Sequence, residues 1–483
     1  MERMARLGIE SREIRGQPLR RAVTLVTAAW VFGSVWVNLT SGAPLTLFAT
    51  HLGASNFEFG LLTAIPFLTS LLSLPASLVT ERTGERKKIF LWGLYTLRML
   101  WFPLTLLPLV LIEHWGFGQR RPAMVMFLLL FTLMNSGQAV GGPAWTSWMA
   151  DLVPERLRGR YFSYRRQWGI LSGVPAALLA GWALDLPRWN STPIRVMETC
   201  AVLFLIGTVC GNIDIAFFHW VPEPRREPQR GAVLMESFAA PLKDHAFLWF
   251  AAFVGTMTFA ISFMGQFVTL YLVERVKLQN MGTQLVTLAA PMIAQLIVLP
   301  VWGMAADRMG KKPLLKIASF GLVPVGLGWC LIKPDTPGGA WIGAALAGAG
   351  AALWAGFEVA NLNLTLEMSA SHGKGGTAYV AVNSVIINIA GCLGGLAAGI
   401  IGQSLQHWTW EIKGFKTVTF YDVLFALSGV LRLVAAAVFL PRMTEPAARP
   451  TREALRYMTA NIYNNIYSAA LMPVRWMGKN SEL

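Results

Sequence analysis

Charged side chains are scarce in this sequence of 483 residues, in which Asp, Glu, Lys and Arg together make up 14%. A soluble domain carries about 25% of these residues. Hydrophobic residues reach 54%, and the mean hydropathy is +0.48. Because a helix needs about 20 apolar residues to cross a bilayer, the apolar runs suffice for about twelve crossings. The composition therefore excludes a soluble globular protein and predicts an all-α membrane protein.

Cysteine and histidine are also few. The four cysteines lie in apolar runs without metal-ligand spacing, and we interpret them as small buried hydrophobic residues: Cys200, Cys210, Cys330 and Cys392. The six histidines are scattered over predicted helix ends and loops. The sequence has no G-x-x-x-x-G-K-S/T phosphate loop, no H-E-x-x-H, no C-x-x-C and no G-x-S-x-G. We therefore expect no enzyme activity, no cofactor, no metal site and no direct coupling to ATP.

Basic residues outnumber acidic ones by 41 to 26, which gives a formal net charge of +15. Under a twelve-helix topology with both termini in the cytoplasm, most Lys and Arg residues fall in inner loops and in the two tails. This distribution is the positive-inside pattern of membrane proteins. The charge therefore predicts the orientation in the membrane rather than binding to nucleic acid. Anionic lipid at the cytoplasmic face is an expected partner.

A short charged phrase occurs twice in the sequence, first as SLVTERTGERKK and later as GMAADRMGKK. Glu81 of the first copy and Asp307 of the second are 226 positions apart, and so are Gly84 and Gly310. Apolar runs flank each copy, which predicts a turn between two membrane helices. A repeat at a spacing near half the chain length indicates an internal duplication.

The second copy closely resembles G-x-x-A-D-R-x-G-K/R-K, the signature loop between the second and third helices in the major facilitator superfamily. The first copy departs from it, because Glu81 replaces Asp, Glu85 stands where a cation is usual, and the leading Gly is missing. The resemblance covers about residues 22–441. It implies twelve transmembrane helices in two pseudo-symmetric six-helix bundles. It also implies a transporter, expected to be a monomer, that binds a small solute near the bilayer midplane and works by alternating access.

Five segments are predicted along the chain. They are a cytoplasmic N-terminal tail (1–21), an N-terminal bundle (22–220), a cytoplasmic linker (221–243), a C-terminal bundle (244–441) and a cytoplasmic tail (442–483). The linker is charged and rich in proline. The predicted helices span residues 22–50, 57–80, 88–112, 122–150, 167–186, 196–219, 246–273, 281–304, 313–332, 340–366, 377–403 and 421–440.

The C-terminal tail holds apolar residues at spacings of three and four. This pattern predicts an amphipathic helix that lies on the inner leaflet, or that docks on the protein's own loops. The residues are Leu455, Met458, Ile462, Ile466 and Ala469.

Polar side chains interrupt the predicted helices one, four, seven and ten. In a bilayer such groups must find a partner or water, so we expect them to line a central cavity. The predicted cavity residues are Asn38, Ser41, Asn135, Gln138, Gln266, Glu358 and Asn361. Their amides and hydroxyls suit a polar neutral or zwitterionic solute. Hydrogen bonding between neighbouring helices is the alternative interpretation.

Charged side chains inside predicted membrane helices are the candidates for energy coupling. Glu358 lies three residues from Asn361 on one helix face, and an intramembrane carboxylate is a candidate proton carrier. Arg98 is expected to face a partner or a cavity, with snorkelling toward the inner surface as the alternative. Arg432 has no evident partner. Proton symport through Glu358 is the sharpest hypothesis, while facilitated diffusion, drug-type antiport and a purely structural Glu358 remain open.

The resemblance further implies an inner gate at the two repeated loops and at the loop after the fourth helix. The residues assigned to this gate are Glu81, Arg82, Gly84, Arg160, Asp307, Arg308 and Gly310. The alternative is that these cations simply follow the positive-inside bias. The sequence thus predicts a secondary active transporter of the cell inner membrane. The competing hypothesis is a facilitator-like protein that no longer transports and serves in membrane assembly or sensing.

Overall fold

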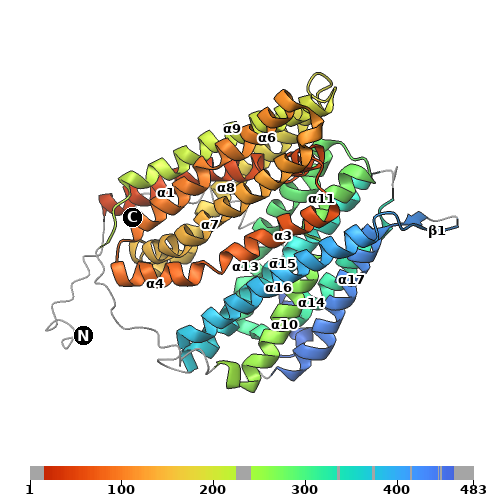
Figure 1. Cartoon of the computed structure of the whole chain (residues 1–483). Helices are drawn as coiled ribbons and strands as arrows, with labels where there is room; N and C mark the ends of the chain where they lie inside the picture. The colour runs from red at the N-terminus through yellow and green to blue at the C-terminus, as the bar shows by residue number, and fades with distance from the viewer. Residues whose placement is uncertain are drawn as a thin grey trace, which may run out of the picture.

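The structure, a computed structural model, describes residues 16–224, 241–333, 338–371, 376–413, 416–443, 445 and 449–461. At residues 155, 156, 160, 370, 371, 376 and 377 it describes the backbone alone. Within the described residues, twelve helical stretches are long and apolar enough to cross a membrane. The expectation of twelve membrane helices is confirmed. The two halves of the chain form two bundles of six spans each (Figure 1).

The N-terminal bundle contains α1 (Gln17–Leu39), α2 (Ala43–His51), α3 (Asn56–Ser70), α4 (Ser73–Thr83), α5 (Arg86–Met99), α6 (Trp101–Trp115), α7 (Arg120–Leu152), α8 (Glu155–Asp185) and α9 (Pro193–Phe217). The first three spans are each made of two consecutive helices, α1 with α2, α3 with α4 and α5 with α6. Single 3-10 turns lie at Phe117–Gln119 and Phe218–Trp220.

The C-terminal bundle contains α10 (His245–Ser262), α11 (Gly265–Glu274), α12 (Asn280–Gln284), α13 (Ala290–Met309), α14 (Lys311–Gly328), α15 (Gly339–Ser371), α16 (Gly376–Ser404) and α17 (Phe420–Val434). Short π-helical segments lie at Leu285–Ala289 and Ala435–Phe439, and 3-10 turns at Pro241–Lys243, Trp329–Leu331 and Leu440–Arg442. A small antiparallel hairpin, β1 (Trp410–Ile412) and β2 (Lys416–Val418), joins α16 to α17. Every span is helical, as expected, and the hairpin is an addition that the sequence analysis did not predict.

Capping residues in the sequence determine where several spans begin. Ser55 and Glu58 form a capping box at the start of α3, in which the Glu58 carboxylate accepts from the Ser55 backbone N–H at 2.7 Å. Thr419 and Asp422 form the same motif before α17. These caps satisfy backbone donors that the first helical turn leaves free.

The fifth span starts earlier than the sequence analysis predicted. The expected start was residue 167, whereas α8 begins at Glu155. The first turns of α8 are rich in arginine and tyrosine, and this polar stretch is helical although it carries no apolar run. Hydropathy detects the part of a helix that lies in hydrocarbon and misses a polar extension beyond it.

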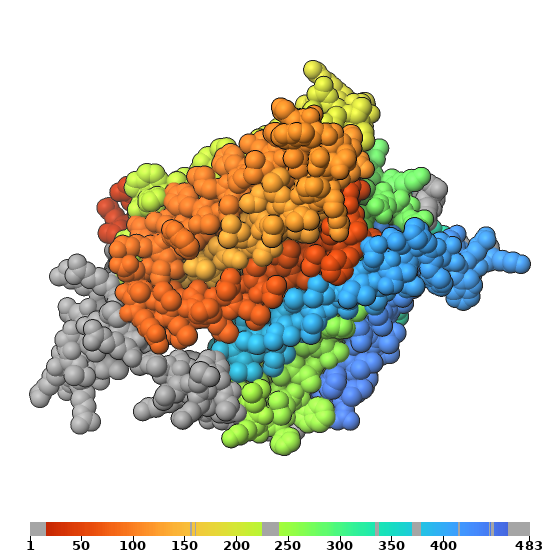
Figure 2. Space-filling model, in the orientation of Figure 1, coloured from red at the N-terminus to blue at the C-terminus, as the bar shows by residue number. Residues whose placement is uncertain are grey.

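Helix α3 lies against the glycine-rich helix α16 and brings the two bundles together (Figure 1). A Cβ atom added at Gly60 would lie 2.5 Å from the Cα of Gly399, and one added at Gly395 would lie 2.9 Å from the backbone N of Ala64. Figure 2 shows the resulting seam on one face of the molecule, where α3 (red-orange) adjoins α16 (blue). The four-residue glycine spacing in α16 therefore serves helix packing.

The two ends of the molecule differ in how the bundles meet. We call the end with the β1–β2 hairpin the hairpin end, and the opposite end, with the turns at Gly84 and Gly310, the tail end. At the hairpin end, the Asp185 carboxylate of the N-terminal bundle accepts from the backbone N–H groups of Asn280 and Met281 at 2.7 and 2.8 Å. Toward the tail end, the axes of the two bundles diverge (Figure 1).

Candidate functional site

A cavity of about 500 Å³ lies among the helices of the N-terminal bundle. Four of the seven predicted cavity residues line it, namely Ser41, Asn135, Gln138 and Gln266, and Arg98 lines it as well. Gln266 comes from α11 and is the contribution of the C-terminal bundle. The structure thus brings together polar side chains that are far apart in the sequence.

A buried ion pair forms part of the wall of this cavity. Nη2 of Arg98 lies 2.9 Å from Oδ2 of Asp214, and both side chains are almost fully buried. The Arg98 guanidinium also stacks on Trp36, 3.2 Å from the ring centroid. Two glycines make room for the pair, because a Cβ at Gly33 or Gly211 would collide with Asp214 or Arg98 respectively. The sequence analysis singled out Arg98 but did not identify Asp214 as its partner.

A second guanidinium on the wall is held between two aromatic rings. The Cζ atom of Arg165 lies 4.3 Å from the centroid of Trp30 and 4.9 Å from that of Trp145. Cation–π contacts of this kind stabilise a charge that water does not fully solvate. Arg165 lies on α8, and all three side chains line the cavity.

Aromatic rings supply much of the remaining wall. They are Trp30, Trp36, Phe90, Trp101, Phe131, Trp145 and Phe218. Small-molecule sites are typically apolar clefts with a few convergent polar groups. This cavity has that character, and its amides, hydroxyl and charged groups can orient a ligand that stacks on the rings.

The other three predicted cavity residues lie elsewhere. Asn38 is buried and donates to the Ser34 carbonyl within α1 at 2.8 Å. Asn361 accepts from Nδ2 of Asn383 on α16 at 3.2 Å, which is a contact between helices. Neither residue lines the 500 Å³ cavity.

Glu358 is exposed on α15 and likewise does not line that cavity. Its carboxylate accepts from Nε1 of Trp354, one helical turn away, at 2.9 Å. Arg166 of α8 is a positive charge that interacts with it from the other bundle. Arg166 also donates to the side-chain oxygen of Gln295 on α13, which connects the bundles directly.

The predicted gate residues lie at the tail end, on the surface of their own bundles. Glu81 and Arg82 are exposed at the end of α4, and Asp307 and Arg308 are exposed at the end of α13. Arg308 lies 5.5 Å from the ring of Tyr457 in the C-terminal tail. Among the described side chains, these gate residues make no contact that joins the two bundles, and the gate role stays a prediction.

The two gate glycines have a clear conformational role. Gly84 and Gly310 have φ angles of +69° and +88°, a region that favours glycine, and each separates two consecutive helices. The side chain of the remaining gate residue, Arg160, lies outside the described part of the structure.

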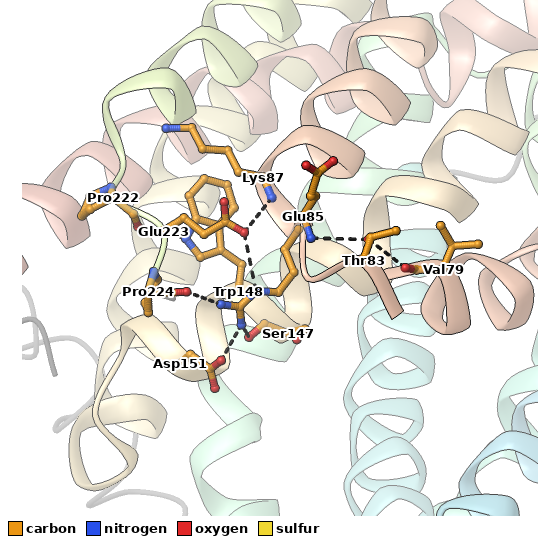
Figure 3. Close-up of polar contacts among 11 residues, drawn as sticks. Val79, Thr83, Glu85, Lys87, Ser147, Trp148, Asp151, Pro222, Glu223 and Pro224 are labelled. Atoms are coloured by element: carbon orange, nitrogen blue, oxygen red, sulfur yellow. Dashed lines mark hydrogen bonds and ion pairs between the residues drawn. The ribbon is translucent and has the colours of Figure 1, made fainter. Parts of the chain in front are cut away.

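Arg86 makes several contacts at the tail end, and the sequence analysis missed it. Its buried guanidinium pairs with Asp151 at the end of α7 and donates to the carbonyl groups of Ser147 and Pro224 at 3.2 and 2.6 Å. Figure 3 labels these three partners. Glu223 lies 3.7 Å from its Nε. Arg86 therefore joins the start of α5 to α7 and to the segment that leaves α9.

A glutamate caps the helix that follows the repeated loop in both halves of the chain. Glu223 accepts from the backbone N–H of Lys87 at 3.1 Å, and Glu445 accepts from those of Lys311 and Lys312 at 3.0 and 2.6 Å. In each half an acid beyond the last span caps the helix after the repeated loop. Each of these glutamates precedes a proline in the sequence, and this repeated Glu-Pro dipeptide is the signal that could have predicted the contact.

The C-terminal tail docks on its own bundle. Residues 451–461 are helical, and Ala454 and Met458 are buried in the core of the C-terminal bundle. The backbone N–H of Arg449 donates to the Met309 carbonyl at 3.0 Å. Of the two positions predicted for this helix, the structure has the docked one over 451–461. The predicted residues Ile462, Ile466 and Ala469 lie outside the described residues.

Comparison with known proteins identifies the family. A model described as Major Facilitator Superfamily matches residues 25–395. This chain belongs to that superfamily. It is therefore a multi-pass membrane transporter rather than an enzyme, from a family whose members bind small solutes. A search of curated protein sequences finds no match.

Solved structures of several transporter types share the fold. A mutant of the nucleoside transporter NupG superposes with a TM-score of 0.64 at 12% identity, over 89% of this chain and 100% of that one. A POT family transporter in complex with a thioalcohol-conjugated peptide gives 0.60 at 13%, over 88% and 97%. A bacterial homolog of the human lysosomal transporter Spinster, inward-facing and unoccupied, gives 0.59 at 14%, over 94% and 99%. At these identities the likeness concerns the fold alone.

Proposed function

We propose that this protein is a secondary active transporter that moves a small solute across the cell inner membrane by alternating access. The 500 Å³ cavity is the observation that carries the proposal, because it combines aromatic walls with converging polar side chains and a buried ion pair. The solute binds there, between α1, α5, α7 and α11. Gln266 supplies the contact from the second bundle, so that bundle movement changes the site.

The tail end is cytoplasmic in this proposal, since the positive-inside bias places the basic loops and tails there. The structure then corresponds to a state closed to the outside. The contacts of Asp185 with α12 and the close approach of Gly60 to Gly399 support this assignment, because both lie in the outer half. Separation of these contacts, with closure at the tail end, completes the transport cycle.

Proton coupling through Glu358 is part of the proposal. Glu358 is exposed, its carboxylate accepts one hydrogen bond from Trp354, and it interacts electrostatically with Arg166 of the other bundle. Protonation of Glu358 would remove its attraction to Arg166 and so change the relative stability of the two states. A carboxylate at such a position is a suitable proton carrier.

Reconstitution into liposomes tests both parts of the proposal. Saturable flux of at least one solute from a labelled panel is expected, and absence of flux for the whole panel would favour the non-transporting alternative. With the transported solute, Glu358→Gln should abolish accumulation driven by a pH gradient and leave downhill exchange intact. Glu411→Gln, an exposed change in β1, is the matched control. Accumulation that persists in Glu358→Gln would show that another residue couples the proton.

A further inference from the structure

Arg432 on α17 carries a buried charge without a carboxylate partner. The residue is 2% exposed, and its described contacts are two hydrogen bonds, one from Nη1 to the Leu322 carbonyl at 3.0 Å and one from Nη2 to the Met264 sulfur at 2.9 Å. Its Nε has no hydrogen-bond partner among the described residues. A thioether is a weak acceptor, so one edge of the guanidinium, Nε with Nη2, is left poorly satisfied. Buried charges are normally paired, because leaving one unpaired is costly.

The contrast with Arg98 makes this arrangement informative. Arg98 is similarly buried in the other bundle, yet Asp214 lies 2.9 Å away and neutralises it. No acid among the described residues takes the place of Asp214 beside Arg432. Arg98 is thus neutralised within the protein, whereas Arg432 has no such counter-charge among the described residues.

Arg432 lines a second cavity, of about 380 Å³, which is formed mostly by the C-terminal bundle and closed by Thr63 and Phe67 of α3. Most of its wall is apolar, with Val268, Leu322 and Leu346 among the lining residues. Ser262 and Thr287 also line the cavity, and their hydroxyl groups donate to the carbonyl groups of Thr258 and Thr283. A single cation in an apolar wall suits a molecule with one anionic group and an apolar body.

The second cavity adjoins the first one at the contact between the two bundles. The backbone N–H of Gln266 donates to Oγ1 of Thr63 at 3.2 Å, and Gly265 packs against the same threonine. Gln266 lines the 500 Å³ cavity, whereas Thr63 and Gly265 line the cavity of Arg432. The crossing of α3 and α11 therefore separates two cavities that both lie next to the moving interface.

From these observations we infer that the cavity of Arg432 binds the carboxylate of an organic anion, and that the transported solutes are organic acids with an apolar body. The Nε and Nη2 edge of a guanidinium can pair with both oxygens of a carboxylate, and in Arg432 the other amino group, Nη1, already donates to the Leu322 carbonyl. This inference rests on the proposed transport function for its physiological meaning. It differs from the neutral or zwitterionic solute that the amide and hydroxyl side chains suggested in the sequence.

Binding of acid and amide pairs to the purified full-length protein tests the inference. The probes are benzoate with benzamide and hexanoate with hexanamide, and the readout is the ligand-dependent shift of the thermal unfolding midpoint. At least one carboxylate should stabilise the protein in a saturable manner, and its amide should not. Equal shifts from acid and amide, or no saturable shift from either carboxylate, would overturn the inference. A shift from sulfate without one from the carboxylates would also overturn it, because the site would then take inorganic anions.

Variants at position 432 separate binding from folding. Arg432→Met should abolish the carboxylate shift. Arg432→Lys keeps the charge but loses the paired edge, and should weaken binding by at least about tenfold. The matched control is Arg442→Met, an exposed arginine close to the end of the same span, which should bind as the wild type does. If Arg432→Met does not fold, Arg432→Lys decides, since wild-type affinity in that variant would contradict a carboxylate held by the guanidinium edge.

Flux measurements distinguish failure of this inference from failure of the proposed function. If the protein transports a neutral solute saturably, if Arg432→Lys does not affect this flux, and if no carboxylate binds, the transport function is supported and the anion site is contradicted. If a carboxylate binds in a manner that depends on Arg432 but no solute is transported, the anion site is supported and the transport function is contradicted.

Discussion

At the scale of single residues, the cost of charge in an apolar interior explains the most unusual side chains. Arg98 and Asp214 are both nearly buried and lie 2.9 Å apart. The ion pair and the Trp36 ring replace part of the hydration that each charge loses. Each partner is therefore required mainly because the other is present.

Removal of one partner of the ion pair should accordingly lower the free energy of unfolding more than removal of both partners. We predict that Asp214→Asn lowers the free energy of unfolding by about 3–5 kcal/mol, because Arg98 is left buried and unpaired. The double variant Arg98→Met with Asp214→Leu should recover most of this loss. Chemical denaturation in detergent micelles measures both effects. Wild-type stability in Asp214→Asn would contradict the account of this pair.

The sequence alone identified charged residues inside membrane helices better than it identified their interaction partners. Arg98 could be singled out because a charge inside an apolar run is rare. Its partner could not, because Asp214 lies near the end of its span and its depth in the bundle depends on how the helices are packed. The same limit applies to Glu358 and Asn361, whose helix was correctly predicted but whose face does not reach the 500 Å³ cavity.

At the scale of helices, the two acids beyond the last span of each half act as caps. Glu223 and Glu445 accept from the first backbone N–H groups of α5 and α14. A carboxylate at a helix N-terminus satisfies free donors and interacts favourably with the helix dipole. The caps also fix the segments that follow α9 and α17 to the turns at Gly84 and Gly310.

Loss of a cap should have a local effect. Glu445→Gln is predicted to lower stability by about 0.3–1 kcal/mol, because the charge at the start of α14 is removed. Hydrogen exchange measured by mass spectrometry should quicken at Lys311 and Lys312 and stay unchanged in α5. Glu411→Gln serves as the control for a general loss of charge. Unchanged exchange at the start of α14 would mean that Glu445 does not protect these amides.

Glycine packing between α3 and α16 leads to a further prediction at this scale. Gly60→Ala places a methyl group against the backbone of Gly399, and overpacking of this kind costs about 1–3 kcal/mol. The cost applies to the state closed at the hairpin end, so saturable flux should fall severalfold. Gly118→Ala, at a glycine with open space around it, should transport as the wild type does. Wild-type flux in Gly60→Ala would show that the close contact between Gly60 and Gly399 is not needed for transport.

At the scale of the whole molecule, the duplication was the most informative feature of the sequence. The repeated phrase, 226 positions apart, predicted two related halves, and the apolar runs predicted twelve spans. Both properties depend on local composition and spacing, so they can be found without a structure. Contacts between the halves, such as that of Asp185 with α12, depend on the packing of distant segments and had no signal in the sequence.

The central claim is that the two bundles move against each other to open the two ends in turn. A reversible cross-link at the hairpin end tests it most directly. Asp185 and Met281 lie on opposite bundles and are in contact, so cysteines at both positions should form a disulfide. The four native cysteines, which are free, are first replaced by alanine.

The measurement is solute flux into liposomes before oxidation, after oxidation and after reduction, with the cross-link verified by gel mobility. The account predicts that the Asp185→Cys, Met281→Cys double variant loses flux on oxidation and regains it on reduction, while each single variant is insensitive. Undiminished flux through the fully cross-linked protein would contradict it, because the hairpin end would then not need to open for transport.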